Sequence, residues 1–558
     1  MLLQKLRDYS GRLDLPPEMY LKRSIRWLID LSADGNLQGF VATEGESGKK
    51  DRGKEFLAPY VARSSGVRAK LLADTGKYVL GIAREKSKSK RVEKCHKAFV
   101  DLVKTCAETT KEPTVATVLR FLKRLDLKTL PLPRDFDAEH NLTFRVDGVM
   151  PIDLPSVRSF WATFATESVL EPMECLICGE VRPPVKRLPF KIKHIPGGQP
   201  SGMAIISANV PAFESYGLEA SLIAPTCREC GERFTKAAID LIENERTHIT
   251  IGPLVYIFWT KEERIFSVAS LLSTPELDEV KALMSSIFTG EERATEIDMT
   301  PFYATAFAAS GARVAVRDWL DTTVEEAKQH LARYFALQRL VEHNGTEGKP
   351  LGLYALASST VRDATKGLPA NVPKALLHVA LKGGPLPMWL LFQAIKRNRA
   401  EQGITRPRAA LIKMVLLSQQ ESFMEDTMTE LDTSHRNPAY LCGRLLALLE
   451  AVQRAAIPGA NTTITDRFFG TASSAPASVF GRLLRGAQAH LGKLRREKPG
   501  TYEALQHKLE EVQVGLTAFP KTLTLEEQGL FGLGYYHQRA ADRAAAIAYK
   551  QAQGKETA

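Results

Sequence analysis

Two cysteine motifs, Cys175-Leu176-Ile177-Cys178-Gly179 and Cys227-Arg228-Glu229-Cys230-Gly231, mark the part of the chain whose fold is most tightly constrained. In each motif, two thiols can approach one tetrahedral metal ion from a tight turn, and two such pairs supply four ligands. A glycine directly after each pair lets the backbone wrap close to the sulfur atoms. The spacing therefore predicts a structural zinc site held by Cys175, Cys178, Cys227 and Cys230.

Two other uses of these cysteines fit the pattern less well. Disulfides are disfavoured in a cytosolic protein, and a redox site needs only one Cys-x-x-Cys pair. Four thiolate ligands leave no open position on the metal, so we expect zinc to stabilise the fold rather than to activate water. The other cysteines are isolated and are expected to be ordinary thiols without a metal: Cys95, Cys106 and Cys442.

Residues 179–226 separate the two pairs, a longer insert than in common zinc ribbons, so we expect a folded excursion whose ends return together. It contains a loop rich in small residues, Lys191-Ile192-Lys193-His194-Ile195-Pro196-Gly197-Gly198-Gln199-Pro200-Ser201-Gly202. Such a loop can approach a sugar-phosphate chain or enter a groove, although a plain hairpin fits equally well. In this zinc element, about residues 170–235, the candidates for reading base edges are Lys191, Lys193, Gln199, Ser201 and Asn209.

Positive charge is concentrated rather than evenly spread over the chain, whose net charge is +11. Lysine and arginine far outnumber acidic residues in 61–100, and residues 181–213 contain no acidic residue at all. Concentrated positive charge attracts phosphate through counterion release, whereas a Lys-rich exposed loop at 84–97 is the alternative interpretation. The candidates for holding phosphates are Arg63, Arg68, Lys70, Arg84, Lys86 and Lys88.

The first 350 residues indicate an α+β domain. Short β-favouring runs at 77–80, 203–207 and 254–259 alternate with turns and with helical stretches such as 155–169. After a linker at 351–375, the pattern becomes helical from 376 to 558. Apolar stripes at 441–452, 480–494 and 502–516, separated by proline and glycine, predict an all-α bundle, and a capping sequence at Thr524 opens its last helix.

The length of 558 residues favours two to four domains, and the composition is that of ordinary globular proteins. Charge interrupts the N-terminal apolar run before a signal peptide could form, and no stretch approaches a membrane span. We therefore expect a cytoplasmic protein. The chain contains neither a phosphate-binding loop motif nor an H-E-x-x-H motif, and its 11 histidines are scattered, so we expect no enzymatic activity.

Several motifs together resemble the large subunit of the type I-C CRISPR Cascade complex. They are the loop at 191–202 with the segment up to 217, Leu71–Gly81, Pro385–Pro387, Tyr440–Leu445, Asn461–Phe468 and Gln528–Gln538. They extend over most of the chain. Since many relatives lack one or both cysteine pairs, the zinc site depends on this sequence alone.

The resemblance implies a subunit of an RNA-guided complex that recognises the protospacer-adjacent motif in double-stranded DNA, promotes duplex opening and supports R-loop formation. The implied partners are target DNA, guide RNA, the backbone and guide-capping subunits, and a recruited helicase-nuclease. The resemblance also implies a small subunit translated from within the C-terminal region. Its translation would start at Met424 or Met428, with Met414 as a further option. The alternatives are an architectural guide-RNA-binding subunit and a zinc-associated nuclease.

Overall fold

The computed structural model describes residues 1–45, 52–61, 63, 66–82, 89–165, 170–263, 266–288, 298–420 and 427–556. The chain divides into two compact units. The first comprises Met1–His194, Gly198–Asp240 and Ser310–Val314, and the second comprises Ile195–Gly197, Leu241–Ala309 and Ala315–Ala558. Within the described ranges, no helix combines the length and apolar character that crossing a membrane requires.

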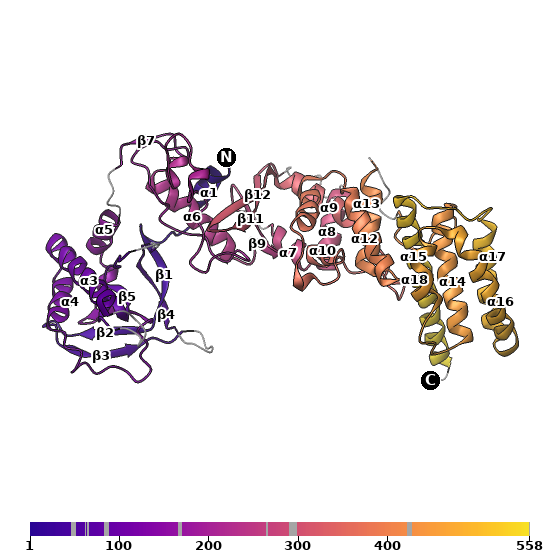
Figure 1. The fold of residues 1–558 in the computed structure, drawn as a ribbon, viewed down its shortest axis with the longest axis horizontal. Coiled ribbons are helices and arrows are strands. Elements are labelled where there is room, and N and C mark those ends of the chain that lie inside the picture. Colours follow the sequence, from indigo (N-terminus) through magenta and orange to yellow (C-terminus); the bar gives the residue numbers. More distant parts are fainter. Residues whose placement is uncertain are drawn as a thin grey trace. The chain divides into compact units, whose positions relative to one another are not determined.

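A four-stranded sheet organises the first unit, with the order β3 (Leu37–Ala42), β2 (Trp27–Leu31), β6 (Asn141–Val146) and β5 (Ala73–Thr75). Strands β2 and β6 are parallel and central, and both carry mostly buried side chains. Helices α3 (Ser89–Thr110) and α4 (Pro113–Arg124) pack on this sheet (Figure 1). Phe144 of β6 contacts Phe99 of α3 and Phe121 of α4, so these three rings join the layers.

Shorter elements complete the first unit. Strands β1 (Tyr20–Ile25) and β4 (Lys54–Pro59) form an antiparallel pair, and β7 (Met173–Glu174) pairs with β8 (Val181–Arg182). The remaining helices are α1 (Leu2–Ser10), α2 (Gly76–Val79), α5 (Pro155–Phe164) and α6 (Arg228–Glu243), with 3₁₀ turns at Pro151–Asp153, Pro211–Phe213 and Ser221–Ile223. The β run predicted at 77–80 is wrong, because these residues lie in and directly after α2.

The second unit begins with an antiparallel sheet of four strands. Its order is β12 (Arg313–Thr323), β11 (Pro301–Ser310), β10 (Leu254–Thr260) and β9 (His248–Ile251). Every residue of β10 is buried, which explains its uninterrupted apolar sequence and confirms the strand predicted at 254–259. Among the described residues, no strand follows Thr323, so an α+β region precedes a helical C-terminal region as predicted.

Helices make up the rest of the second unit: α7 (Val268–Ser273), α8 (Leu277–Phe288), α9 (Val324–Gln338), α10 (Leu353–Ser358), α11 (Asn371–Lys382), α12 (Met388–Glu401), α13 (Arg406–Ser418), α14 (Pro438–Ala456), α15 (Ile464–Ala472), α16 (Phe480–Glu497), α17 (Pro499–Val514) and α18 (Leu525–Glu556). The 3₁₀ turns here are Ala364–Lys366 and Pro476–Ser478. Residues 351–375, expected to be a linker, contain α10 and the start of α11. Leu353, Leu356 and Val372 in this segment are buried in the core of the unit.

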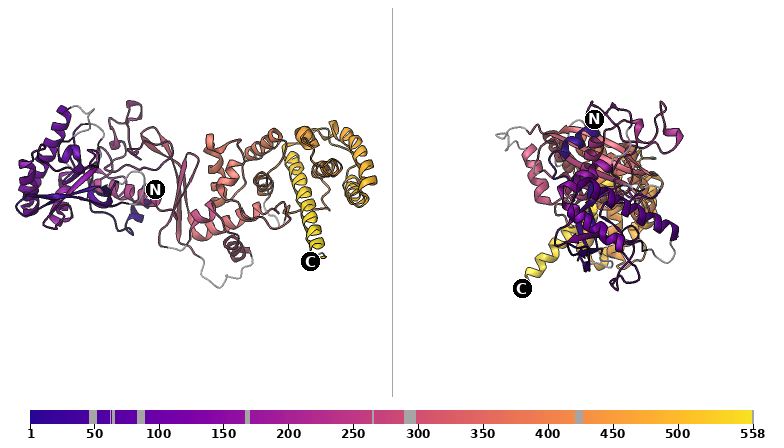
Figure 2. Two further views of the ribbon diagram at one scale, coloured as in Figure 1. Left: turned by 90° about the horizontal axis from the view of Figure 1, so that it is seen from below. Right: turned by 90° about the vertical axis from the view of Figure 1, so that its left-hand side faces the viewer.

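The last five helices enclose an apolar core of their own. The predicted stripes at 441–452, 480–494 and 502–516 supply most of its side chains. The predicted start of the last helix is also confirmed, because the Thr524 hydroxyl accepts from the Glu527 amide and the Glu527 carboxylate accepts from the Thr524 amide. Helix α18 is the longest of these helices and extends beyond its neighbours (Figure 2).

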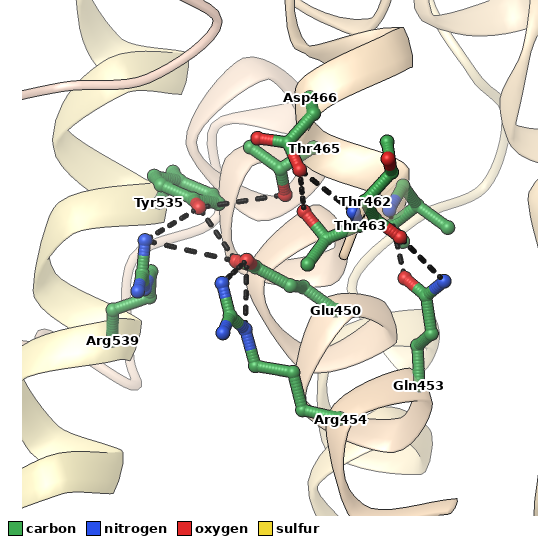
Figure 3. Close-up of polar contacts among 10 residues, drawn as sticks. Glu450, Gln453, Arg454, Thr462, Thr463, Thr465, Asp466, Tyr535 and Arg539 are labelled. Atoms are coloured by element: carbon green, nitrogen blue, oxygen red, sulfur yellow. Dashed lines mark hydrogen bonds and ion pairs between the residues drawn. The ribbon is translucent and has the colours of Figure 1, made fainter. Parts of the chain in front are cut away.

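A buried carboxylate, Glu450 of α14, joins this helix to α18 (Figure 3). Arg454 donates to it over 2.7 and 3.0 Å, and the Tyr535 hydroxyl of α18 donates over 2.6 Å. Burial opposes ionisation, but Arg539, Tyr535 and Arg454 outweigh it and lower the pKa of Glu450. Next to it, Thr463 and Asp466 form the capping box of α15, so the motif at 461–468 has a clear structural role.

Two glycines let the backbones of α14 and α18 approach closely. A Cβ at Gly443 of α14 would lie 2.0 Å from the Phe531 carbonyl oxygen, and one at Gly534 of α18 would lie 2.1 Å from the Tyr440 carbonyl oxygen. Neither obstacle is a flexible side-chain end, so the helices themselves would have to separate. The close packing of α14 and α18 therefore explains why the motifs at 440–445 and 528–538 contain Gly443 and Gly534.

Replacing Gly443 by alanine is expected to lower the free energy of unfolding of the C-terminal helices by about 1–3 kcal/mol, the usual cost of overpacking. Gly486→Ala on α16 is the matched control, because a Cβ there meets nothing within 4 Å. The control should raise stability by about 0.5–1 kcal/mol, since alanine favours helix over glycine. Denaturant titration of both variants measures the difference, and equal effects would contradict the packing argument.

Candidate metal centre and nucleic-acid interface

The four predicted metal ligands lie together. The sulfur atoms of Cys175, Cys178, Cys227 and Cys230 are all within 4.8 Å of one another, and those of Cys178 and Cys227 are 4.0 Å apart. All four are free thiols, and all but Cys178 are buried. The geometry is compatible with a structural metal ion bound by four sulfur ligands.

The two pairs are presented differently. Cys175 and Cys178 lie in the turn between β7 and β8, where the Gly179 amide donates to the Cys175 carbonyl over 2.8 Å. Gly179 has a φ of +76°, which favours glycine, as expected from the sequence. Cys227 instead precedes α6 and Cys230 lies in its first turn, so the same expectation for Gly231 is wrong. Gly231 is helical, and a Cβ there would meet Leu188 at 3.0 Å.

The surroundings favour the ionisation of one of these thiols and oppose that of two others. Burial raises the pKa of Cys175, but the backbone amides of Cys227, Cys178 and Ile177 outweigh it and lower this pKa to about 7. Burial raises the pKa of Cys227 and that of Cys230. One thiolate is thus favoured and at least two are opposed, an imbalance that a bound dication would remove.

Helix α6 connects this cluster to the N-terminal segment. Its buried Lys236 and Glu232 form an ion pair at 2.5 Å. Lys236 also donates to the Pro16 carbonyl over 2.9 Å, and Glu232 accepts from the Met19 amide over 3.1 Å. The cysteine cluster therefore lies at the N-terminus of a helix whose buried charges hold residues 16–19.

A cationic cluster gathers residues from both basic segments of the sequence. Its centre is Asp74, a fully buried carboxylate that forms an ion pair with Arg63 and accepts from the Lys70 amide over 2.9 Å. The Arg63 guanidinium also lies 3.9 Å from the centre of the Tyr78 ring. The motif at 71–81 therefore surrounds one buried carboxylate.

Lys70 experiences several other positive charges. Burial lowers the pKa of Lys70 to about 8, although Asp74 opposes the shift. The charges of Arg63, Arg23 and Lys193 lower this pKa further. Lys193, from the loop between the cysteine pairs, thus interacts electrostatically with residues more than a hundred positions earlier. We call Arg23, Arg63, Lys70 and Lys193 the cationic cluster.

Arg23, on β1, was not predicted from the sequence. Its guanidinium lies 4.9 Å from the centre of the Tyr60 ring, and its Nε is buried with no hydrogen-bond partner among the described residues. Tyr60 in turn stacks on Phe190 at 5.1 Å. An isolated arginine in a strand gives no signal in the sequence, because only the fold brings it beside Lys70.

The glycine-containing loop begins next to this cluster. Ile192 and Met203 exchange backbone hydrogen bonds of 2.9 and 2.8 Å and so close the loop. Gly202 has a φ of +87°, and a Cβ there would lie 2.8 Å from that of Lys191. Gln199 and Ser201 are exposed, Lys191 is half-buried, and Asn209 is exposed at the base of a separate loop closed by Ala208 and Ala220.

The other predicted phosphate contacts have different outcomes. Arg68 is exposed, and its carbonyl accepts from the Arg63 Nε over 2.7 Å, which ties it to the cluster. Arg84, Lys86 and Lys88 lie outside the described residues. In the second basic segment, Arg182 and Lys186 form ion pairs with Glu229 and Glu219, so acidic residues from elsewhere neutralise part of that segment.

Comparison with known proteins identifies one family. The family model Cas_Csd1, described as CRISPR-associated protein, matches residues 3–542. A search of the curated proteins finds no match. Because the family match extends over nearly the whole chain, this protein belongs to the Cas_Csd1 family of CRISPR-associated proteins.

Proposed function

We propose that this chain is the non-catalytic large subunit of a type I-C Cascade complex. In that role it recognises the protospacer-adjacent motif in duplex DNA, promotes duplex opening and supports the R-loop. The main support is the cationic cluster. Arg63 pairs with the buried Asp74, and the charges of Arg63, Arg23 and Lys193 all act on Lys70, so positive charge is concentrated beside an exposed loop of small and polar residues. Such charge holds phosphates, and Gln199 and Ser201 are free to reach base edges.

We propose zinc as the ion at the four cysteines. Zinc–sulfur bonds of about 2.3 Å in a tetrahedron separate the sulfur atoms by about 3.8 Å, close to the 4.0 Å between Cys178 and Cys227. Four sulfur ligands leave no position for a substrate, so the ion would act on stability alone.

The proposed partners follow from membership of a CRISPR-associated family. They are target duplex DNA, guide RNA, the backbone and guide-capping subunits and a recruited helicase-nuclease, all in the cytoplasm. A small subunit made from the C-terminal region is part of the same proposal. Met428, half-buried and just before α14, is one start, whereas Met424 lies outside the described residues. The separate apolar core of α14–α18 favours such a fragment.

Double replacement of Gln199 and Asn209 by alanine is expected to relax motif recognition by at least about thirtyfold, because each of the two base contacts contributes about 1–3 kcal/mol. The measurement is binding of the assembled complex to duplexes in which the bases flanking the target are randomised. Assembly should remain intact because both side chains are exposed. An unchanged profile of selected bases would contradict these two assignments.

DNA binding is expected to weaken as the pH rises through about 8, because free Lys70 loses its proton there while phosphate holds the charged form. If bound DNA restores an ordinary lysine pKa, affinity falls about tenfold between pH 7 and pH 9. Binding titrations at fixed ionic strength measure this change. Lys70→Gln should abolish it, and a pH dependence that persists in this variant would contradict the role of Lys70.

A further inference from the structure

A cavity of about 340 Å³ lies within the second unit, away from the residues discussed above. Helix α8, the end of α9, the segment 347–350 and Arg406 at the start of α13 line it. Its volume is in the range of small-molecule sites. Gly348 packs closely against its neighbours in this lining: a Cβ there would lie 2.2 Å from Arg406 Nη2 and 2.3 Å from the Leu340 carbonyl oxygen.

Positive charge dominates the polar part of the lining. Lys281, Arg339, Lys349 and Arg406 contribute cations, and Glu347 contributes an anion. Glu347 lies 2.7 Å from the Lys281 Nζ and 3.5 Å from the Arg339 Nε, so one carboxylate is shared by two cations. Glu342, outside the lining, partly neutralises Arg406, and the remaining excess of positive charge favours an anionic ligand.

Two buried donors in the lining have no hydrogen-bond partner among the described residues. Gln338 is 3% exposed; its Oε1 accepts from the Leu351 amide over 2.7 Å, which leaves the Nε2 unpaired. The Arg406 Nε is also buried and unpaired, although its Nη atoms contact the Lys349 carbonyl and Glu342. Buried donors in folded proteins nearly always have an acceptor, so these two are suited to acceptors of a ligand.

The rest of the lining is largely apolar. Phe335 and Val280 are buried, and Met284, Leu277 and Pro350 lie beside them. An aromatic ring and a thioether form a surface on which a planar group can pack. The cavity thus combines an apolar wall, buried donors and an outer set of cations.

We propose that this cavity binds one nucleotide unit, with its base against Phe335 and Met284 and its phosphate beside Lys349 and Arg339. Gln338 Nε2 donates to a carbonyl or ring nitrogen of the base. The ligand is either a free nucleotide or one nucleotide of a single strand, since both have the same base and phosphate. This site goes beyond the proposed recognition of duplex DNA and involves none of the same residues.

Calorimetric titration of the full chain with adenosine monophosphate and with a five-nucleotide DNA single strand tests the site. We expect saturable binding of at least one probe. The probe that binds with the higher affinity shows whether the ligand is a free nucleotide or part of a single strand. Gln338→Glu should weaken binding at least tenfold, because it replaces the donor with an acceptor while keeping the acceptor for Leu351. Lys349→Ala should weaken it about fivefold.

Lys366→Ala is the control, because this lysine is 85% exposed and outside the cavity lining. It should leave binding unchanged, as should Lys70→Gln, which separates this site from the proposed duplex interface. If Gln338→Glu does not fold, the exposed Lys349 decides the outcome. Absence of saturation with both probes, or equal binding by Lys349→Ala and Lys366→Ala, would overturn the proposal.

Discussion

Replacing Cys227 or Cys230 by serine is expected to remove about one equivalent of bound metal and to destabilise the first unit by about 4–5 kcal/mol or more, since losing a metal site is among the most damaging single changes. The physical reason is that Cys230 lies in the first turn of α6. Without the ion, the buried thiols oppose one another's ionisation, and the metal-mediated link between the start of this helix and the turn that holds Cys175 and Cys178 is lost. Metal analysis and thermal unfolding of the purified chain measure both effects.

The destabilisation should spread along α6. Glu232 and Lys236 hold residues 16–19 through buried hydrogen bonds, so a loosened helix exposes that segment to protease. Cys106→Ala is the matched control, because Cys106 is buried on α3 and outside the cluster. It should leave the metal content unchanged. A wild-type chain with well under one metal per protein would contradict the predicted metal centre.

Metal affinity should also fall in acid. Binding displaces protons from the thiols, so protons compete with the metal. The pKa of Cys175 is about 7 and those of Cys227 and Cys230 are raised, so acidification below pH 7 protonates Cys175 as well as these two thiols in the free cluster. This is the direction expected of a site held by thiolates.

The double variant Lys70→Gln with Lys193→Gln is expected to weaken duplex binding by about thirtyfold to a thousandfold for every DNA sequence, taking each of the two charged contacts as about 1–2 kcal/mol. The salt dependence should become less steep by about 0.9 for each phosphate contact removed. Lys70 suits this test because Asp74 keeps its ion pair with Arg63 and its hydrogen bond from the backbone amide of residue 70, so the substitution does not leave an unpaired buried acid. Titrations at several salt concentrations measure affinity and slope together.

Lys104→Gln is the matched control for charge. Lys104 is 54% exposed on α3, where it forms an ordinary surface pair with Glu108. Its loss should change the affinity and the salt slope little. If this control weakened binding as much as Lys70→Gln does, the effect would come from net charge and the cationic cluster would have no special role.

The parts of the site that could be predicted are those specified by local spacing. Two Cys-x-x-Cys pairs admit few arrangements, because four sulfur atoms must lie at nearly equal distances, and the structure brings all four together. The apolar stripes of α14, α16 and α17 were predictable for a similar reason: a period of 3.6 residues records which face of a helix is buried.

The rest depends on contacts between distant segments. Nothing near Arg23 in the sequence relates it to Lys70, and the motif that contains Asp74 does not reveal that this carboxylate pairs with Arg63. Gly231 follows its cysteine pair as Gly179 does, yet it is helical because α6 begins at Arg228, within the second pair. Gln338 and Arg406 meet only because α9 and α13 are adjacent in the fold.

Photo-cross-linking at Gln199 in the assembled complex tests most directly whether the exposed loop contacts target DNA. A photoreactive residue in its place should cross-link to the duplex beside the target sequence, and the yield should fall when the flanking bases are changed. Cross-links to the guide RNA alone, with equal yield in the presence and absence of target duplex, would contradict motif recognition and favour an architectural role on the guide.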